Sequence, residues 1–172
     1  MADQHQFLIA ANQLLACAVE AFAVNPNPPA IACLTWGDPI ANMGVDGDDC
    51  CEGAMYVNEV EFYPSSNLFP DRTIERQSGP CGVLAWAVRF QLTAFRCWPD
   101  AGMTRISCDQ RTAAVEQLYA DQQAIRKALC CFQKINKNYL TAVTEGEPLD
   151  PAGGCAGSYA RVSIQLPQCD SC

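Results

Sequence analysis

Residues 82–97 alternate between apolar and more polar positions, which is the spacing of a β-strand. A shift of one residue would expose the aromatic side chains and bury Arg89, so the register is strongly specified. The pattern therefore predicts a long central antiparallel strand with one covered face. That face carries Leu84, Trp86, Val88, Phe90, Leu92 and Ala94, whereas Arg89, Gln91 and Thr93 make the middle of the other face polar.

Two stretches carry apolar residues at steps of three and four, the spacing of amphipathic helices. The first spans residues 3–24 and stops before Pro26, which cannot continue a helix. The second begins at Ser107, which together with Gln110 matches a capping box, and it continues to Ile135. We expect these two helices to cover the apolar face of the central strand.

Three further strands are predicted, at residues 31–36, 53–63 and 158–166. The first reads as short and buried. In the second, Val57 and Val60 fall on opposite faces, so a bulge near Asn58 and Glu59 is expected. Residues 145–157 are rich in Pro and Gly and predict a loop. The element order predicts a single α+β domain over residues 1–172, an antiparallel sheet with two amphipathic helices on one face.

Two long connections, residues 37–51 and 64–81, show no period of their own. Connections of this length in a compact domain are usually functional or mobile. We interpret them as arms that reach a neighbouring subunit. The tail at residues 167–172 is expected to be loose.

Charge and composition exclude several classes of function. The formal net charge is −8 and no basic run is present, which argues against a nucleic-acid reader and against docking on an anionic membrane. The first apolar stretch follows no positive residue and contains Asn12, Gln13 and Glu20, so it does not resemble a signal peptide or a membrane span. We expect a protein made in the cytoplasm.

Few residues of the chain match a pattern typical of a catalytic site. His5 is the chain's single histidine and lies near its N-terminus, where nothing would hold a catalytic base rigidly. Gly153 and Gly154 do not have the spacing of a phosphate loop. Asp46, Asp48 and Asp49 fail the calcium-loop template, which needs a glutamate at its twelfth position. The sequence predicts neither an enzyme nor a bound cofactor or metal.

The chain has twelve cysteines, which is many for a reducing compartment. Three interpretations remain open: reduced buried thiols, disulfides formed after the chain leaves the cytoplasm, or a structural zinc site. A zinc ribbon needs two C-x₂-C knuckles, and the chain has this spacing once, at Cys169 and Cys172. Cys81 and Cys97 bracket the central strand and need partners elsewhere, for which Cys51 and Cys155 are candidates. The candidate disulfide cysteines are Cys50, Cys51, Cys81, Cys97, Cys130, Cys131 and Cys155.

Several short motifs occur in a fixed order along the chain: DDCCEG before a strand, EFYPSSNLFP after it, PCG and RC at the ends of the long strand, CC ending the capped helix, and GGCAG before the last strand. This order resembles that of a neck protein of tailed bacteriophages that infect actinobacteria. The similarity spans residues 33–166, and the cysteine placement is its specific part. The element order also resembles that of tail terminator proteins, a less specific likeness.

This resemblance implies a virion protein that forms a hexameric ring, stops growth of the tail tube and meets the head-side connector. The implied partners are further copies of the chain, the major tail tube protein, the head-side connector or stopper, and double-stranded DNA that passes without specific binding. A head–tail stopper or connector is an alternative, as is a cysteine-based zinc-binding or redox module. Predicted subunit contacts are Asp46, Asp48, Asp49, Phe69, Asp71, Arg72, Glu75 and Arg76.

Overall fold

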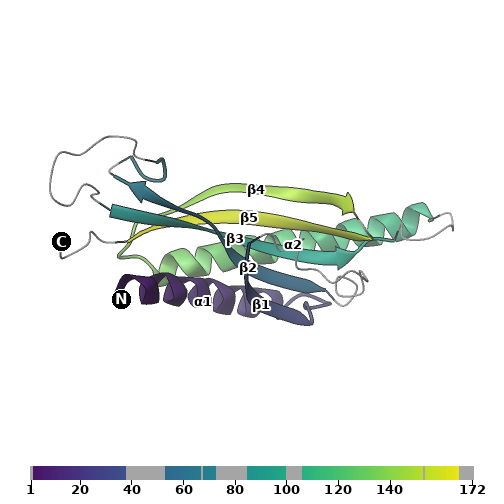
Figure 1. Cartoon of the computed structure of the whole chain (residues 1–172). Coiled ribbons are helices and arrows are strands. Elements are labelled where there is room, and N and C mark those ends of the chain that lie inside the picture. Colours follow the sequence, from purple (N-terminus) through teal and green to yellow (C-terminus); the bar gives the residue numbers. More distant parts are fainter. Residues whose placement is uncertain are drawn as a thin grey trace.

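The chain forms a single α+β domain in which two helices pack on a five-stranded sheet (Figure 1). The computed structural model describes residues 2–37, 53–66, 68–72, 85–99, 106–152 and 154–166. The predicted connection at 37–51 and the tail at 167–172 lie almost wholly outside these residues. The helices are α1 (Ala2–Phe22) and α2 (Cys108–Ile135), and the strands are β1 (Ile31–Trp36), β2 (Ala54–Ser65), β3 (Ala85–Cys97), β4 (Thr141–Ala152) and β5 (Cys155–Leu166).

The sheet order is β1-β2-β3-β5-β4, so β3 is the central strand, as its alternation predicts. Three of the four strand pairs are antiparallel, but β1 pairs with β2 in parallel, with Ile31 opposite Ala54. The expectation of an antiparallel sheet was therefore wrong for this pair. A parallel pair needs a long crossover, and the long connection between β1 and β2 meets that requirement.

Strand β4 corrects the prediction of a loop at residues 145–157. It occupies one edge of the sheet and pairs with β5 through a register that shifts twice, once after Val143 and once after Leu149. The sequence does not indicate a strand here, because Pro148 and Pro151 cannot donate the backbone hydrogen bonds that join neighbouring strands. An edge strand tolerates this loss, since one side of its backbone has no neighbouring strand to bond.

The irregularity expected in β2 is present, slightly beyond its predicted place. The β2–β3 register shifts between Glu59 and Glu61. After the shift Glu61 meets Arg89 on the face away from the helices, and Phe62 lies on the helix side beside Phe7. Val57 is in the core, whereas Val60 remains exposed, so the bulge realigns the end of the strand and not the two valines.

The main core lies between the helices and the sheet. The predicted covered face of β3 is buried there through Val88, Phe90, Leu92 and Ala94. It meets side chains from both helices, namely Leu14, Ala18, Phe22, Ile125, Leu129 and Phe132. The capping box predicted at the start of α2 is confirmed, with Ser107 accepting from the Gln110 backbone and Gln110 accepting from the Ser107 backbone.

The opposite face of the sheet is not simply open to solvent, which corrects the expectation of one covered face. A second, smaller core on that side consists of Ala54, Tyr56, Phe95 and Cys155. Thr93, on the same face of β3 as Arg89, has no exposed surface. Only the middle of this face is polar, and its polar side chains form the first candidate site.

Candidate functional site

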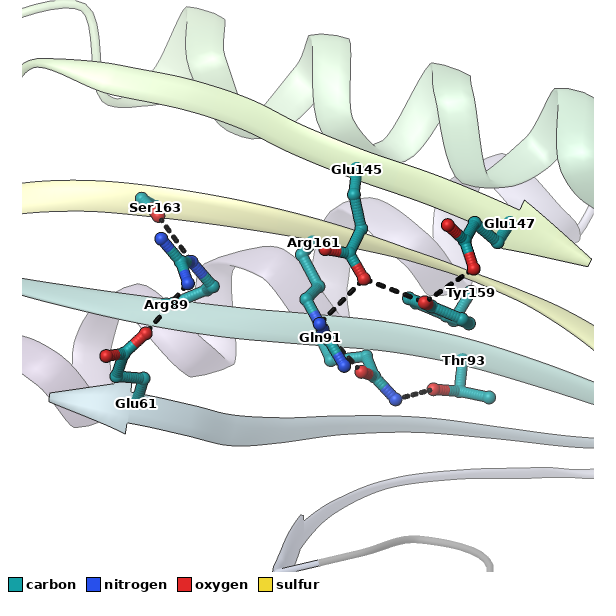
Figure 2. Close-up of polar contacts among 9 residues, drawn as sticks. All are labelled: Glu61, Arg89, Gln91, Thr93, Glu145, Glu147, Tyr159, Arg161 and Ser163. Atoms are coloured by element: carbon teal, nitrogen blue, oxygen red, sulfur yellow. Dashed lines mark hydrogen bonds and ion pairs between the residues drawn. The ribbon is translucent and has the colours of Figure 1, made fainter. Parts of the chain in front are cut away.

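Cross-strand pairs of charged side chains follow the polar face of the sheet (Figure 2). At one end, Arg89 of β3 lies between Glu61 of β2 and Ser163 of β5. Its Nη1 is 2.7 Å from Glu61 Oε2, and its Nε donates to Ser163 Oγ at 3.2 Å. Glu61 also pairs with Arg72. The strand register places these residues directly opposite one another, so the contacts follow from the backbone pairing.

The other end of this face is organised around Arg161 of β5 (Figure 2). Its Nη1 lies 2.6 Å from Glu145 Oε1, and its Nε donates to Gln91 Oε1 at 2.9 Å. The Tyr159 hydroxyl lies 2.7 Å from Glu145 Oε1 and 3.2 Å from Glu147 Oε2. The Arg161 guanidinium also covers the Tyr159 ring, 5.1 Å from its centroid.

These two networks hold neighbouring strands in register and leave few charged groups available for catalysis or ligand binding. They contain three arginines (Arg72, Arg89 and Arg161) and three glutamates (Glu61, Glu145 and Glu147), so their formal charge is zero. Each arginine is paired with a carboxylate. An arginine engaged in this way is not available to bind a phosphate or to stabilise a reaction intermediate.

Tyr159 gives this face a measurable pH dependence. Its hydrogen bond to Glu145, with smaller contributions from burial and from Glu147, raises the pKa of the phenol from 10.0 to about 12. The folded state therefore holds this proton more tightly, and the resulting stabilisation is present below pH 10 and is lost as the pH rises from 10 to about 12.

We expect a Tyr159→Phe variant to lose the last phase of phenolate absorbance in an alkaline titration. The control is Tyr119→Phe, which removes an exposed phenol and should retain that phase. If Tyr159→Phe also retained it, the last phase could not be assigned to Tyr159.

An apolar groove of about 600 Å³ lies at the opposite edge of the sheet from β4, between the first half of α1 and strands β1 and β2. We call it the α1–β1 groove. It is lined by Phe7, Leu8, Ala11, Leu34, Thr35, Trp36, Val57, Glu59, Phe62 and Phe90. Leu8 and Phe62 are about half exposed, and Trp36 is 82% exposed. A contiguous apolar surface of this kind is typical of an interaction site in a soluble protein.

Packing among aromatic rings fixes the wall of the α1–β1 groove. Phe62 stacks on Trp86 with the ring centroids 4.3 Å apart, and Phe7 contacts the edge of Phe62 at 5.2 Å. Phe62 reaches this side of the sheet because of the β2 bulge. The lining residues that the structure describes therefore belong to the sheet and to one helix.

Glu59 is the charged residue in this apolar lining. Burial raises the pKa of its carboxyl above the ordinary value, because the charged form loses contact with water. Among the residues that the structure describes, no side chain forms a hydrogen bond or ion pair with it. A partly desolvated carboxylate with no cation beside it is favourable for binding a cationic group.

Sequence reasoning missed the α1–β1 groove because it assigned residues 31–36 to a buried strand. None of the residues of β1 is fully buried, and the strand lies at the edge of the sheet. The sequence signal that could have indicated exposure is weak: a large aromatic residue, Trp36, ends a short strand directly before Gly37. The edge position itself depends on pairing with β2, which the hydrophobic pattern does not specify.

The predicted arm contacts are only partly within the described chain. Asp46, Asp48, Asp49, Glu75 and Arg76 lie outside it. Phe69, Asp71 and Arg72 belong to a turn that folds back on its own sheet, where the Tyr63 hydroxyl donates to the Pro70 carbonyl at 2.9 Å. Asp71 and Arg72 remain exposed on this turn. The strand β2 also extends to Ser65, so the connection begins later than the predicted residue 64.

The cysteines divide into bonded and free ones. A disulfide joins Cys17 of α1 to Cys131 of α2, which ties the two helices together, and sequence reasoning did not single out Cys17. Cys97 and Cys155 are also disulfide-bonded. The candidate Cys130 is instead a free, exposed thiol, because consecutive residues of a helix point in different directions. Cys50, Cys51 and Cys81 lie outside the described residues.

Cys33 and Cys108 are free thiols as well. Burial raises the pKa of Cys33, so a smaller fraction of it is thiolate at neutral pH.

Within the described ranges, no group of three His, Cys, Asp or Glu side chains is placed to hold a metal ion. Neither described helix has the length and apolar character needed to cross a bilayer. No protein-family model and no curated protein sequence matches this chain.

Proposed function

We propose that this chain is a structural virion protein of the tail terminator type. In this proposal it forms a homo-oligomeric, hexameric ring at the head–tail junction of a tailed bacteriophage. The ring terminates the tail tube, contacts the head-side connector and lets DNA pass. The observation that carries the proposal is the α1–β1 groove, because a protein that works by assembly needs an uncovered apolar surface on a rigid frame.

Two further features support this function. The motif order and cysteine placement resemble those of neck proteins, and the two helices on one face of the sheet are compatible with a terminator-like fold. The charged face of the sheet adds a third consideration. Its arginines are already paired with glutamates, so they offer DNA few phosphate contacts, and each missing contact lowers nonspecific affinity.

The proposal is tested by the mass of the assembled protein and by its effect on tail tubes. Native mass spectrometry should give a ring of identical subunits without additional metal mass. Added to polymerising tail tube protein, the ring should bind the tube ends and shorten the tubes, which electron microscopy can measure. A ring that binds the head-side connector but leaves tube length unchanged would indicate a stopper instead. A monomer with stoichiometric zinc would contradict the proposal and favour a cysteine-based metal module.

A further inference from the structure

A short segment at the end of α2 combines exposed apolar side chains with positive charge, whereas the α1–β1 groove is apolar with a negative charge. We call residues 134–140, which comprise the last two residues of α2 and the link to β4, the post-helix turn. Ile135, Tyr139 and Leu140 are large apolar residues on this turn, and between 39% and 55% of each is exposed. Lys134, directly before Ile135, and Lys137, between Ile135 and Tyr139, are also exposed. The chain has three lysines, and all lie within residues 127–137, so this region is cationic in an acidic protein.

The post-helix turn is held in one conformation by hydrogen bonds. Asn136 is buried, and both its backbone N–H and its side-chain Nδ2 donate to the Phe132 carbonyl at 3.0 Å. The Tyr139 N–H donates to the Asn136 carbonyl at 2.9 Å, and the Leu140 carbonyl accepts from the Gln165 N–H at 2.9 Å. A segment ordered in this way pays little entropy on binding, because it is already in its bound shape.

The groove and the turn lie at opposite edges of the sheet. Strand β1 is one end of the sheet order and β4 is the other, with α1 packed over the β1 side and α2 over β5 (Figure 1). One subunit therefore cannot bring its own turn into its own groove. Two copies placed edge to edge can do so, and each copy then has a free groove and a free turn for the next.

We infer that the post-helix turn of one copy docks in the α1–β1 groove of the next copy. This inference rests on the proposed ring function and names the surfaces that build the ring. Tyr139 and Leu140 pack against Trp36 and Phe62, and a lysine ammonium from Lys134 or Lys137 pairs with Glu59. The contact is heterologous, with different surfaces on its two sides, so repetition closes a ring when the rotation between copies is suitable.

Charge complementarity is the main reason to choose a second copy as the occupant. The groove offers a partly desolvated carboxylate in an apolar wall, with no described side chain paired to it, and the turn offers ammonium groups beside apolar side chains. Neither lysine forms an ion pair with a described residue of its own chain. A charge pair that becomes desolvated at the centre of an apolar contact favours the correct partner over other proteins, because a mismatched charge would be costly there.

The test uses one variant for each surface and then mixes them. Glu59→Lys replaces the carboxylate of the groove with a positive charge that repels the lysines of the turn. Leu140→Ser reduces the apolar surface of the turn. We expect each variant alone to be monomeric, with the dissociation constant raised about tenfold or more, as measured by native mass spectrometry and light scattering. Mixed together, they should form a one-to-one dimer that does not grow, because the intact turn of one variant fills the intact groove of the other.

Matched controls are Glu116→Lys and Val24→Ser, which change an exposed glutamate and an exposed valine away from both surfaces. These should assemble as the parent chain does. Trp36→Ser provides a second groove variant at a mostly exposed position, should Glu59→Lys unfold the domain. A thermal melt of each variant checks folding.

The outcomes separate this inference from the proposed function. If the parent protein forms rings and neither groove variant nor the turn variant alters them, the docking inference is wrong and the ring function stands. If the variants behave as expected but rings do not bind tail tube ends, the docking is supported and the terminator function is contradicted. A larger oligomer from the mixed variants would also contradict the docking, because only one intact contact is available per pair.

Discussion

Replacing Asp121 with alanine is expected to lower the free energy of unfolding by about 3–5 kcal/mol, because it leaves the guanidinium of Arg96 buried without a partner. Arg96 Nε and Nη2 donate to the two carboxylate oxygens of Asp121 at 2.6 and 2.8 Å. The Asp121 side chain is 1% exposed and that of Arg96 is 10% exposed. Urea unfolding followed by circular dichroism measures the loss.

The surroundings of this pair explain why the expected effect is large. Asp121 also accepts hydrogen bonds from Asn25 at 3.0 Å and Gln117 at 3.2 Å, so its removal leaves several donors unsatisfied. On the other side, the guanidinium lies against Gly53, where an added Cβ would be 2.5 Å from Arg96 Nη1. Gly53 also has a positive φ of 81°, so both its backbone and its lack of a side chain suit this position.

The control is the more exposed pair of Arg161 and Glu145, whose side chains are 29% and 35% exposed. Glu145→Ala should cost about 1 kcal/mol or less, since solvent screens such a pair. A combined Arg96→Met and Asp121→Leu variant should recover much of the stability lost in Asp121→Ala, because no charge is then left buried. Equal effects of Asp121→Ala and Glu145→Ala would contradict this account.

The second large effect is expected for the disulfide between the helices. Cys17 and Cys131 are 114 residues apart in the sequence, so the bond closes a long loop in the unfolded chain. On the chain-entropy account, a loop of this length stabilises the folded state by about 4–5 kcal/mol. A double Cys17→Ala, Cys131→Ala variant should lose about that amount in urea unfolding without reductant.

Cys130→Ser is the matched control for the disulfide, since it removes a free, exposed thiol one residue from Cys131. It should change the free energy of unfolding by less than about 0.5 kcal/mol. Intact mass before and after reduction should show one bridge fewer in the double variant than in the parent chain. Unchanged stability of the double variant would mean that packing between α1 and α2 is sufficient without the bond.

The Cys17–Cys131 disulfide and the Arg96–Asp121 ion pair both connect α2 to another element of the fold. The disulfide joins α1 to α2, while Arg96 and Asp121 join β3 to α2, so together they fix the helix layer to the sheet. The proposed groove needs α1 to stay in place against β1 and β2, and the proposed turn needs α2 to end in a fixed position. Loss of either link is therefore expected to weaken assembly as well as folding.

The candidate surfaces were the least predictable part of the molecule. The sequence placed subunit contacts in the long connections because length and polarity indicate exposed loops. The described part of the second connection contacts its own sheet through Tyr63 and Pro70 and leaves Asp71 and Arg72 exposed, so the predicted contacts there stay a prediction. The groove was missed because residues 31–36 were expected to form a buried strand, whereas β1 lies at the edge of the sheet, a position that depends on its pairing with β2.

The sequence by itself determined the features that depend on neighbours along the chain. Alternation in residues 82–97 defined the central strand and its buried face, steps of three and four defined both helices, and Ser107 with Gln110 defined the start of α2. Tertiary structure alone decided the parallel pairing of β1, the edge position of β4, the partner of Cys131 and the pairing of Arg96 with Asp121. These choices join residues far apart in the sequence, and their free energy depends on which surfaces meet in the folded chain, which local patterning does not specify.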